Sequence, residues 1–137
     1  MKDNVFLDTN ILVYLHSITE TKKRDASISV LRNYTCATST QVLNEFSNVF
    51  IKKYKTSNET IKKSIINISK SCSVQLITER VICFALDINN RYGYSYYDCL
   101  IISSALESGC KTLFSEDMSN RQIIENKLEI VNPYKEL

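Results

Sequence analysis

Short apolar runs alternate along the chain with longer segments of helical periodicity. Runs of three residues at 5–7, 36–38, 74–76 and 112–114 have the composition of buried strands, and 129–131 resembles a last one. Between them, apolar residues recur at steps of three and four, which is typical of amphipathic helices. The expected helical segments are 10–16, 25–33, 42–53, 61–72, 81–92 and 95–108.

The alternation of strands and helices predicts a parallel sheet. A helix in each connection between parallel strands gives βαβ units with right-handed crossovers. The strands are continuous apolar runs, which is typical of a sheet covered by helices on both faces. The sequence contains no internal repeat, low-complexity tract or linker, so we expect an α/β protein with one domain over residues 1–137.

Composition narrows the class of protein further. The hydrophobic fraction of 44% is ordinary for a globular domain, and no apolar run approaches the roughly 20 residues of a membrane span. Asp8 ends the first apolar stretch too early for a signal peptide, so we expect a cytoplasmic protein. Five scattered cysteines and a single histidine argue against a zinc site. The two glycines form neither a GxGxxG nor a P-loop motif, which argues against those nucleotide sites.

Acidic residues gather where the expected strands end. Asp8 directly follows strand 5–7, and Asp117 comes shortly after strand 112–114. Asp98 lies at the start of helix 95–108, and Glu45 lies one turn into the helix after strand 36–38. Ligand sites of open parallel sheets lie at the carboxyl ends of the strands. We therefore expect these four carboxylates at one edge of the sheet.

Each of these acids alone has a structural explanation. Asp8 and Asp117 could cap helices that follow them. Ser95 and Asp98 resemble a capping box, and Glu45 could be a solvated helix residue. Four carboxylates that converge on one edge would nevertheless repel one another unless a cation lay between them. Oxygen ligands without histidine or thiolate suit Mg²⁺ or Mn²⁺, and such a site can orient a phosphodiester and activate a water.

Four segments of the chain resemble the PIN-domain family, in particular its VapC-type toxin ribonucleases. The segments are FLDTNILVY (6–14), STQVLNEF (39–46), YSYYDCLII (94–102) and LFSEDM (113–118). A single DTN motif is unspecific, whereas four segments in the family's order across most of the chain are a specific match. The resemblance implies a three-layer α/β/α sandwich around a parallel sheet, and hydrolysis of RNA that depends on Mg²⁺ or Mn²⁺.

The resemblance also assigns roles to particular residues. It implies that Asp8 and Asp98 are the principal metal ligands, and that Glu45 and Asp117 complete the catalytic acidic quartet. Ser115 stands where the family has a small hydroxyl residue that supports the site, and Asn10 lies beside the metal edge, where it is expected to orient a ligand.

There are small departures from the family pattern. Tyr97 stands where many relatives have tryptophan, and Cys99 where many have alanine. Both positions keep an apolar character, so the catalytic assignment is little affected.

Partners follow from local charge and from the resemblance. The basic cluster Lys52, Lys53 and Lys55 is a candidate surface for the phosphate backbone of RNA, or else a solvated helix end. The resemblance implies an antitoxin partner and a homodimer, for which the apolar stripes at 61–68 and 81–92 are candidate contacts. The alternative function is a catalytically silent module that binds RNA or protein on the same fold.

Overall fold

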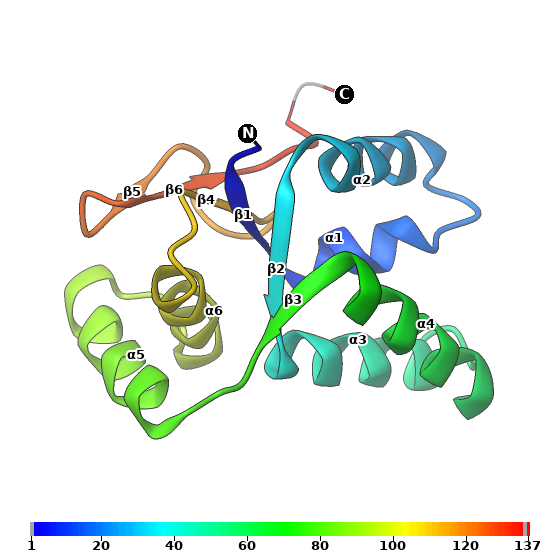
Figure 1. The fold of residues 1–137 in the computed structure, drawn as a ribbon, viewed down its shortest axis with the longest axis horizontal. Helices are drawn as coiled ribbons and strands as arrows, with labels where there is room; N and C mark the ends of the chain where they lie inside the picture. Colours follow the sequence, from blue (N-terminus) through cyan, green and yellow to red (C-terminus); the bar gives the residue numbers. More distant parts are fainter. Residues whose placement is uncertain (1, 136) are drawn as a thin grey trace.

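The computed structural model describes residues 2–135 and 137, so only Met1 and Glu136 of the expected domain lie outside it. A central sheet lies between two layers of helices, with α5 and α6 on one face and α1 to α4 on the other (Figure 1). The strands are β1 (Asn4–Leu7), β2 (Thr35–Ser39), β3 (Cys72–Gln75), β4 (Thr112–Phe114), β5 (Ile123–Ile124) and β6 (Leu128–Val131). The helices are α1 (Thr9–Leu15), α2 (Thr21–Asn33), α3 (Thr40–Lys52), α4 (Asn58–Ser71), α5 (Glu79–Tyr92) and α6 (Tyr96–Glu107). The expected three-layer α/β/α sandwich is confirmed.

The strand order explains where a site can form. It is β3-β2-β1-β4-β6-β5, and all neighbours are parallel except the antiparallel pair β5 and β6. The chain moves outward from β1 through β2 to β3, and later returns to the other side of β1 with β4. Neighbouring connections therefore diverge between β1 and β4, and ligands bind at such a switch point.

The sheet and α6 form most of the core. Val5, Phe6 and Leu7 of β1 are completely buried, because β1 has a strand on each side and a helical layer on each face. In α6, every residue from Cys99 to Ala105 is buried, since this helix packs between the sheet and α5. A helix buried all round has no polar stripe, which explains why the sequence of α6 shows little periodicity.

The observed elements depart from the expected ones in two places. Cys72 was expected at the end of a helical stripe, but it begins β3. In the parallel pairing of β3 with β2, Cys72 lies opposite Cys36. The short strand β5 was not expected, so the sheet is mixed and not wholly parallel. Its hairpin turns through Glu125 and Asn126, both with positive φ. Such a turn is usually marked by Asn-Gly or Asp-Gly, a signal that this sequence lacks.

The apolar stripes suggested as dimer contacts pack within the monomer. Ile61 and Ile68 of α4 are buried, as are Val81, Ala85 and Ile88 of α5. A homodimer would therefore have to use other residues. Among the residues that the structure describes, no helix is both long and apolar enough to cross a membrane.

Candidate active site

Asp8 occupies the switch point between β1 and β4. Its backbone N–H donates to the carbonyl of Phe114 at 3.1 Å, which continues the β1–β4 pairing one residue further. The Asp8 side chain is only 5% exposed, and both of its oxygens accept hydrogen bonds. Oδ1 accepts from the backbone N–H of Thr9 at 2.7 Å, and Oδ2 accepts from the Ser115 hydroxyl at 2.8 Å. Asp8 thus caps α1, as one interpretation proposed, while its carboxylate is held at the sheet edge.

Glu45 reaches the same edge from α3. The helix begins after Ser39, whose hydroxyl accepts from the N–H of Val42. One turn later, Glu45 Oε2 accepts from the Thr9 hydroxyl at 2.7 Å, and its Oε1 accepts from the Gln41 amide at 2.8 Å. The same amide donates to the Tyr97 carbonyl at 3.1 Å, which connects α3 to the start of α6. Glu45 is therefore a fixed residue of the site and not a freely solvated helix residue.

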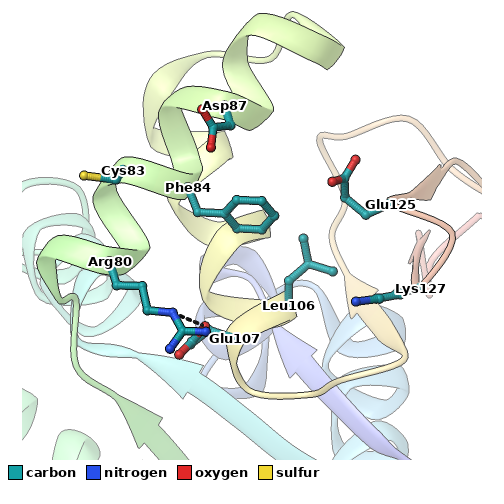
Figure 2. A pocket seen from close by; sticks show the side chains of 8 residues that line it. All are labelled: Arg80, Cys83, Phe84, Asp87, Leu106, Glu107, Glu125 and Lys127. Carbon is teal, nitrogen blue, oxygen red and sulfur yellow. Dashed lines mark ion pairs between the residues drawn. The ribbon is translucent and has the colours of Figure 1, made fainter.

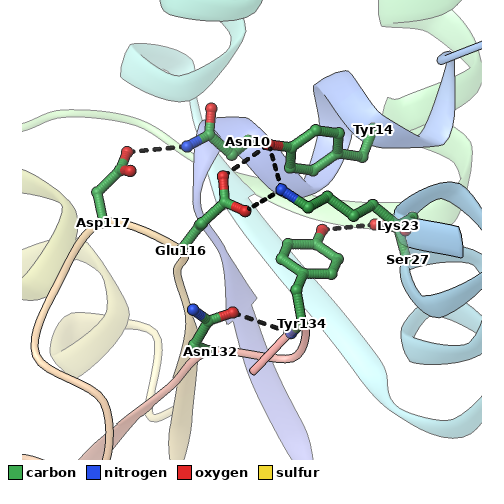
Figure 3. Close-up of polar contacts among 8 residues, drawn as sticks. All are labelled: Asn10, Tyr14, Lys23, Ser27, Glu116, Asp117, Asn132 and Tyr134. Carbon is green, nitrogen blue, oxygen red and sulfur yellow. Dashed lines mark hydrogen bonds and ion pairs between the residues drawn. The ribbon is translucent and has the colours of Figure 1, made fainter. Parts of the chain in front are cut away.

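Asp98 and Asp117 complete the acidic edge from two further segments. Asp98 lies in the first turn of α6, and its backbone N–H donates to the capping hydroxyl of Ser95 at 3.3 Å. Asp117 follows β4, and its Oδ2 accepts from the Asn10 amide at 2.8 Å (Figure 3). Residues 116–122 form bends and turns without a helix, so the interpretation of Asp117 as a helix cap is wrong.

The four acids surround a single pocket of about 310 Å³. Its lining residues are Asp8, Thr9, Asn10, Glu45, Asn48, Val49, Asp98, Ile101 and Asp117. Ser115 lies behind Asp8, where its hydroxyl supports the carboxylate. The structure therefore brings together all four acids and both supporting residues that the sequence pointed to.

Burial and mutual repulsion disfavour the ionised acids. Burial raises the pKa of Asp8 to about 6, against the opposing hydrogen bonds from Ser115 and Thr9. The charges of Glu45 and Asp98 also contribute to this raised value. Burial also raises the pKa of Asp98 above its ordinary value, and the charges of Asp117 and Glu45 act in the same direction against a hydrogen bond with Ser95. The pocket thus carries an uncompensated negative potential that a cation would relieve.

The donor set fits a hard divalent ion in one binding mode. Across residues 2–135, no three His, Cys, Asp or Glu side chains are arranged to hold a single metal ion. An all-protein cage is therefore a poor fit. Mg²⁺, however, usually binds through one or two carboxylates and keeps waters and substrate phosphate oxygens as its other ligands. Asp8 and Asp98 both line the pocket, and the charge of Asp98 contributes to the raised pKa of Asp8, so this pair is suited to that mode.

The basic cluster lies at the far end of the helix that carries Glu45. Asn48 lines the pocket, and Lys52 lies four residues further along α3, on the same helix face. Lys53 caps α3, and its ammonium lies 5.5 Å from the centre of the Tyr54 ring. Lys55 follows in a left-handed backbone conformation. All three lysines are exposed, so they are available to a ligand that extends from the pocket along α3.

A second pocket, of about 580 Å³, lies between α5, α6 and the β5–β6 hairpin (Figure 2). Its charged residues are largely paired, since Arg80 lies 3.5 Å from Glu107, and Glu125 binds Arg91 outside the pocket. None of the four expected acids lines it. The chemistry indicated by the sequence therefore belongs to the smaller acidic pocket.

Comparison with known proteins assigns the chain to a family. A sequence model of the PIN domain matches residues 5–125, which is most of the chain. The chain belongs to the PIN-domain family. Within this PIN domain, the matched residues include all four acids of the pocket. A comparison with curated protein sequences gave no match.

Several solved structures share the fold of this PIN domain. A toxin–antitoxin complex from Klebsiella pneumoniae has a TM-score of 0.71 at 20% identity, over 95% of this chain and 98% of the other. VapBC2 from Rickettsia felis, solved with a DNA fragment from its promoter, has a TM-score of 0.67 at 20% identity, covering 94% and 99%. VapC20 from Mycobacterium tuberculosis, described as a toxin that cleaves the sarcin–ricin loop, has a TM-score of 0.66 at 17% identity, covering 82% and 91%.

Three residues of the pocket region were not singled out from the sequence. Thr9 and Gln41 hold the two oxygens of Glu45, and Asn48 lines the pocket wall. Gln41 and Asn48 lie four residues before and three residues after Glu45 on α3, so helical spacing around a candidate acid was an available signal. Thr9 contacts Glu45 across 36 residues of sequence, for which no local pattern exists.

Proposed function

We propose that this PIN domain is a divalent-metal-dependent endoribonuclease and the toxin of a type II toxin–antitoxin pair. The observation that carries the proposal is the pocket in which four separate segments present Asp8, Glu45, Asp98 and Asp117 to one another. Like charges gathered in one pocket repel one another and destabilise the empty site, so a protein with no use for a cation gains nothing from them. The similar folds that include a sarcin–ricin-loop-cleaving toxin support RNA as the substrate.

The proposed mechanism divides the reaction among the four acids. A bound Mg²⁺ or Mn²⁺ would activate a water and offset charge on the scissile phosphate. Asp8 and Asp98 would hold the ion, and Asp117 would complete the site. Glu45 Oε2, oriented by the Thr9 hydroxyl, would take the proton of the attacking water. The leaving oxygen of the RNA would take a proton from solvent, because the pocket is open.

The flanking RNA would follow α3 and the start of α6. Lys52, Lys53 and Lys55 would contact backbone phosphates beyond the pocket. Tyr97 is 65% exposed beside the acidic pocket and offers an aromatic face to an unpaired base. Tyr94 and Tyr96 are packed against the core, which leaves Tyr97 as the more suitable of the three tyrosines.

The proposed partners are an antitoxin and a second copy of the chain, in the cytoplasm. The similar structures include toxin–antitoxin complexes, which supports an antitoxin. For a homodimer, exposed apolar side chains outside the core are the available contacts: Ile18, Ile51, Ile66, Leu76, Leu86 and Ile123. Light scattering at micromolar concentration should give twice the monomer mass, and a monomer would contradict the dimer.

The deciding experiment measures cleavage of single-stranded RNA by the parent protein and by Asp98→Asn. Cleavage should require Mg²⁺ or Mn²⁺ and stop with a chelator. Asp98→Asn should lose more than about 100-fold in rate, since even residues that only support metal ligands are worth about 10- to 100-fold. Asp87→Asn is the matched control, because Asp87 is an exposed acid of the other pocket. If the parent binds RNA without cleaving it, the silent binding module replaces the proposed function.

A further inference from the structure

Three consecutive residues after β4 are each held by a different hydrogen bond. Ser115 donates to Asp8, and Asp117 accepts from Asn10. Between them, Glu116 turns away from the acidic pocket, which it does not line. Its Oε1 accepts from the Tyr14 hydroxyl at 2.6 Å, and its Oε2 accepts from the Lys23 ammonium at 2.7 Å (Figure 3).

Lys23 is restrained far more than a typical surface lysine. Its side chain is 30% exposed, and its ammonium also donates to the Tyr14 hydroxyl at 3.2 Å. The ammonium lies 4.8 Å from the centre of the Tyr14 ring and 5.7 Å from that of Tyr134. Tyr134 is fixed in turn by Ser27, whose hydroxyl lies 2.6 Å from the tyrosine hydroxyl. Most exposed ion pairs contribute little, but this one is part of a half-buried network.

Side chains of α1 and α2 therefore hold the segment that carries Asp117. Asn10 and Tyr14 lie four residues apart on one face of α1 and hold Asp117 and Glu116, respectively. Lys23 adds a third attachment from α2. Because Glu116 and Asp117 are adjacent, anchoring the first restricts the backbone of the second.

We propose that Lys23, together with Tyr14, is a positioning residue that anchors and neutralises Glu116 and thereby holds Asp117 at the acidic pocket. The inference rests on the proposed nuclease function. Without Lys23, the Glu116 carboxylate would keep only the Tyr14 hydroxyl as a partner, and a partly buried charge that has lost its counter-ion is unfavourable. The segment would then shift, and with it Asp117.

The kinetic test compares Lys23→Met with Lys22→Met. Met keeps the apolar stem and the helix propensity of lysine, and Lys22 is the exposed neighbour on α2. Lys23→Met should lower kcat about tenfold and raise the Mg²⁺ concentration needed for half-maximal rate, while the KM for RNA stays unchanged. Lys22→Met should behave as the parent.

A second-site change separates positioning from direct RNA contact. Adding Glu116→Gln to Lys23→Met removes the unneutralised charge but keeps an acceptor for Tyr14, so most of the lost rate should return. No recovery would overturn the inference. It would also be overturned if Lys23→Met raised the KM, left kcat unchanged and weakened the salt dependence of binding, because Lys23 would then contact a phosphate.

A measurement without RNA keeps the inference independent of the nuclease activity. In ¹H–¹⁵N spectra, Lys23→Met should shift the backbone amides of residues 115–118 and the side-chain amide of Asn10, whereas Lys22→Met should not. Shifts confined to α2 would overturn the inference, even for an active enzyme. An inactive parent that shows the expected shifts would overturn the proposed function and leave the anchoring intact. If Lys23→Met does not fold, Tyr14→Phe replaces it in these spectra. That change removes the hydroxyl that donates to Glu116 and should shift the same amides.

Discussion

At the scale of single residues, each acid of the pocket is held by a hydrogen bond from another segment or from a helix cap. The sequence indicated the acids together with the supports Asn10 and Ser115, but not the supports Thr9 and Gln41. Asp8 directly follows one apolar run and Asp117 comes three residues after another, so the rule that sites lie at strand ends finds both. The hydroxyl that holds Glu45 belongs to Thr9, which lies 36 residues away in the sequence and has no local pattern that connects it to Glu45. Contacts between side chains distant in sequence depend on the packing of whole elements, which a local pattern does not contain.

The raised pKa of Asp8 predicts a pH-dependent stability of the metal-free protein. The ordinary pKa is 3.8 and the folded value is about 6, so the native state holds the proton more tightly than the unfolded chain. The free energy of unfolding should therefore decrease as the pH rises from about 4 to about 6, by about 3 kcal/mol at most. Asp8→Asn cannot ionise and should lose this part of the pH dependence.

Denaturant unfolding in the presence of a chelator, at pH 4, 5, 6 and 7, measures this effect. Asp87→Asn serves as the control, since Asp87 is exposed. Equal pH profiles for the parent and Asp8→Asn would contradict the burial of an ionisable Asp8.

At the scale of elements, a residue or segment can cap a helix and also contribute to the acidic pocket. Asp8 caps α1 and Ser95 caps α6, yet Asp8 and Asp98 both face the acidic pocket. The alternatives weighed from the sequence were therefore not exclusive, because helix starts and strand ends meet at the same edge. The strand β5, and with it the β5–β6 hairpin, was not predicted for a different reason. Two-residue strands carry no period, and its turn uses Glu125 and Asn126 in place of a glycine.

The cap of α6 should matter for activity, whereas a remote cap should not. Ser95→Ala removes the acceptor for the Asp98 N–H, and Ser57→Ala removes the equivalent acceptor at the start of α4. Each change should lower the free energy of unfolding by about 1 kcal/mol. Only Ser95→Ala should reduce RNA cleavage, because only its helix carries an acid of the pocket. Cleavage assays and denaturant melts on both variants test this, and equal activities would argue against precise placement of Asp98.

At the scale of the whole molecule, the charge distribution is more informative than the total. The net charge is only +2, yet the helix α3 contributes Glu45 to the acidic pocket and leads into the basic cluster at its carboxyl end. Composition could not reveal that arrangement, because it depends on the face that each residue takes. The parallel part of the sheet and its helical layers, by contrast, followed from the alternation of apolar runs.

Charge reversal should separate RNA binding from metal binding. Changing Lys52, Lys53 and Lys55 to Glu should weaken RNA affinity and flatten its salt dependence, by about 0.7 in the log–log slope for each lost phosphate contact. Stabilisation by Mg²⁺ in a thermal melt should persist, since the acids are untouched. The control changes Lys111, Lys127 and Lys135 to Glu, which alters the net charge equally but leaves the basic cluster intact. Equal loss of affinity in both triple variants would indicate a non-specific effect of net charge.

The pairing of β4 with β1 has a consequence for synthesis of the protein. Ser115 and Asp117 contact Asp8 and Asn10 across 107 residues of sequence. On the ribosome, the amino-terminal half emerges first and can begin to fold before the rest is made. It cannot assemble the acidic pocket, because the segment that carries Ser115 and Asp117 is translated about a hundred residues after Asp8. The complete acidic pocket can therefore form only after residues 113–118 have left the exit tunnel, so the nascent chain lacks an assembled site before that point.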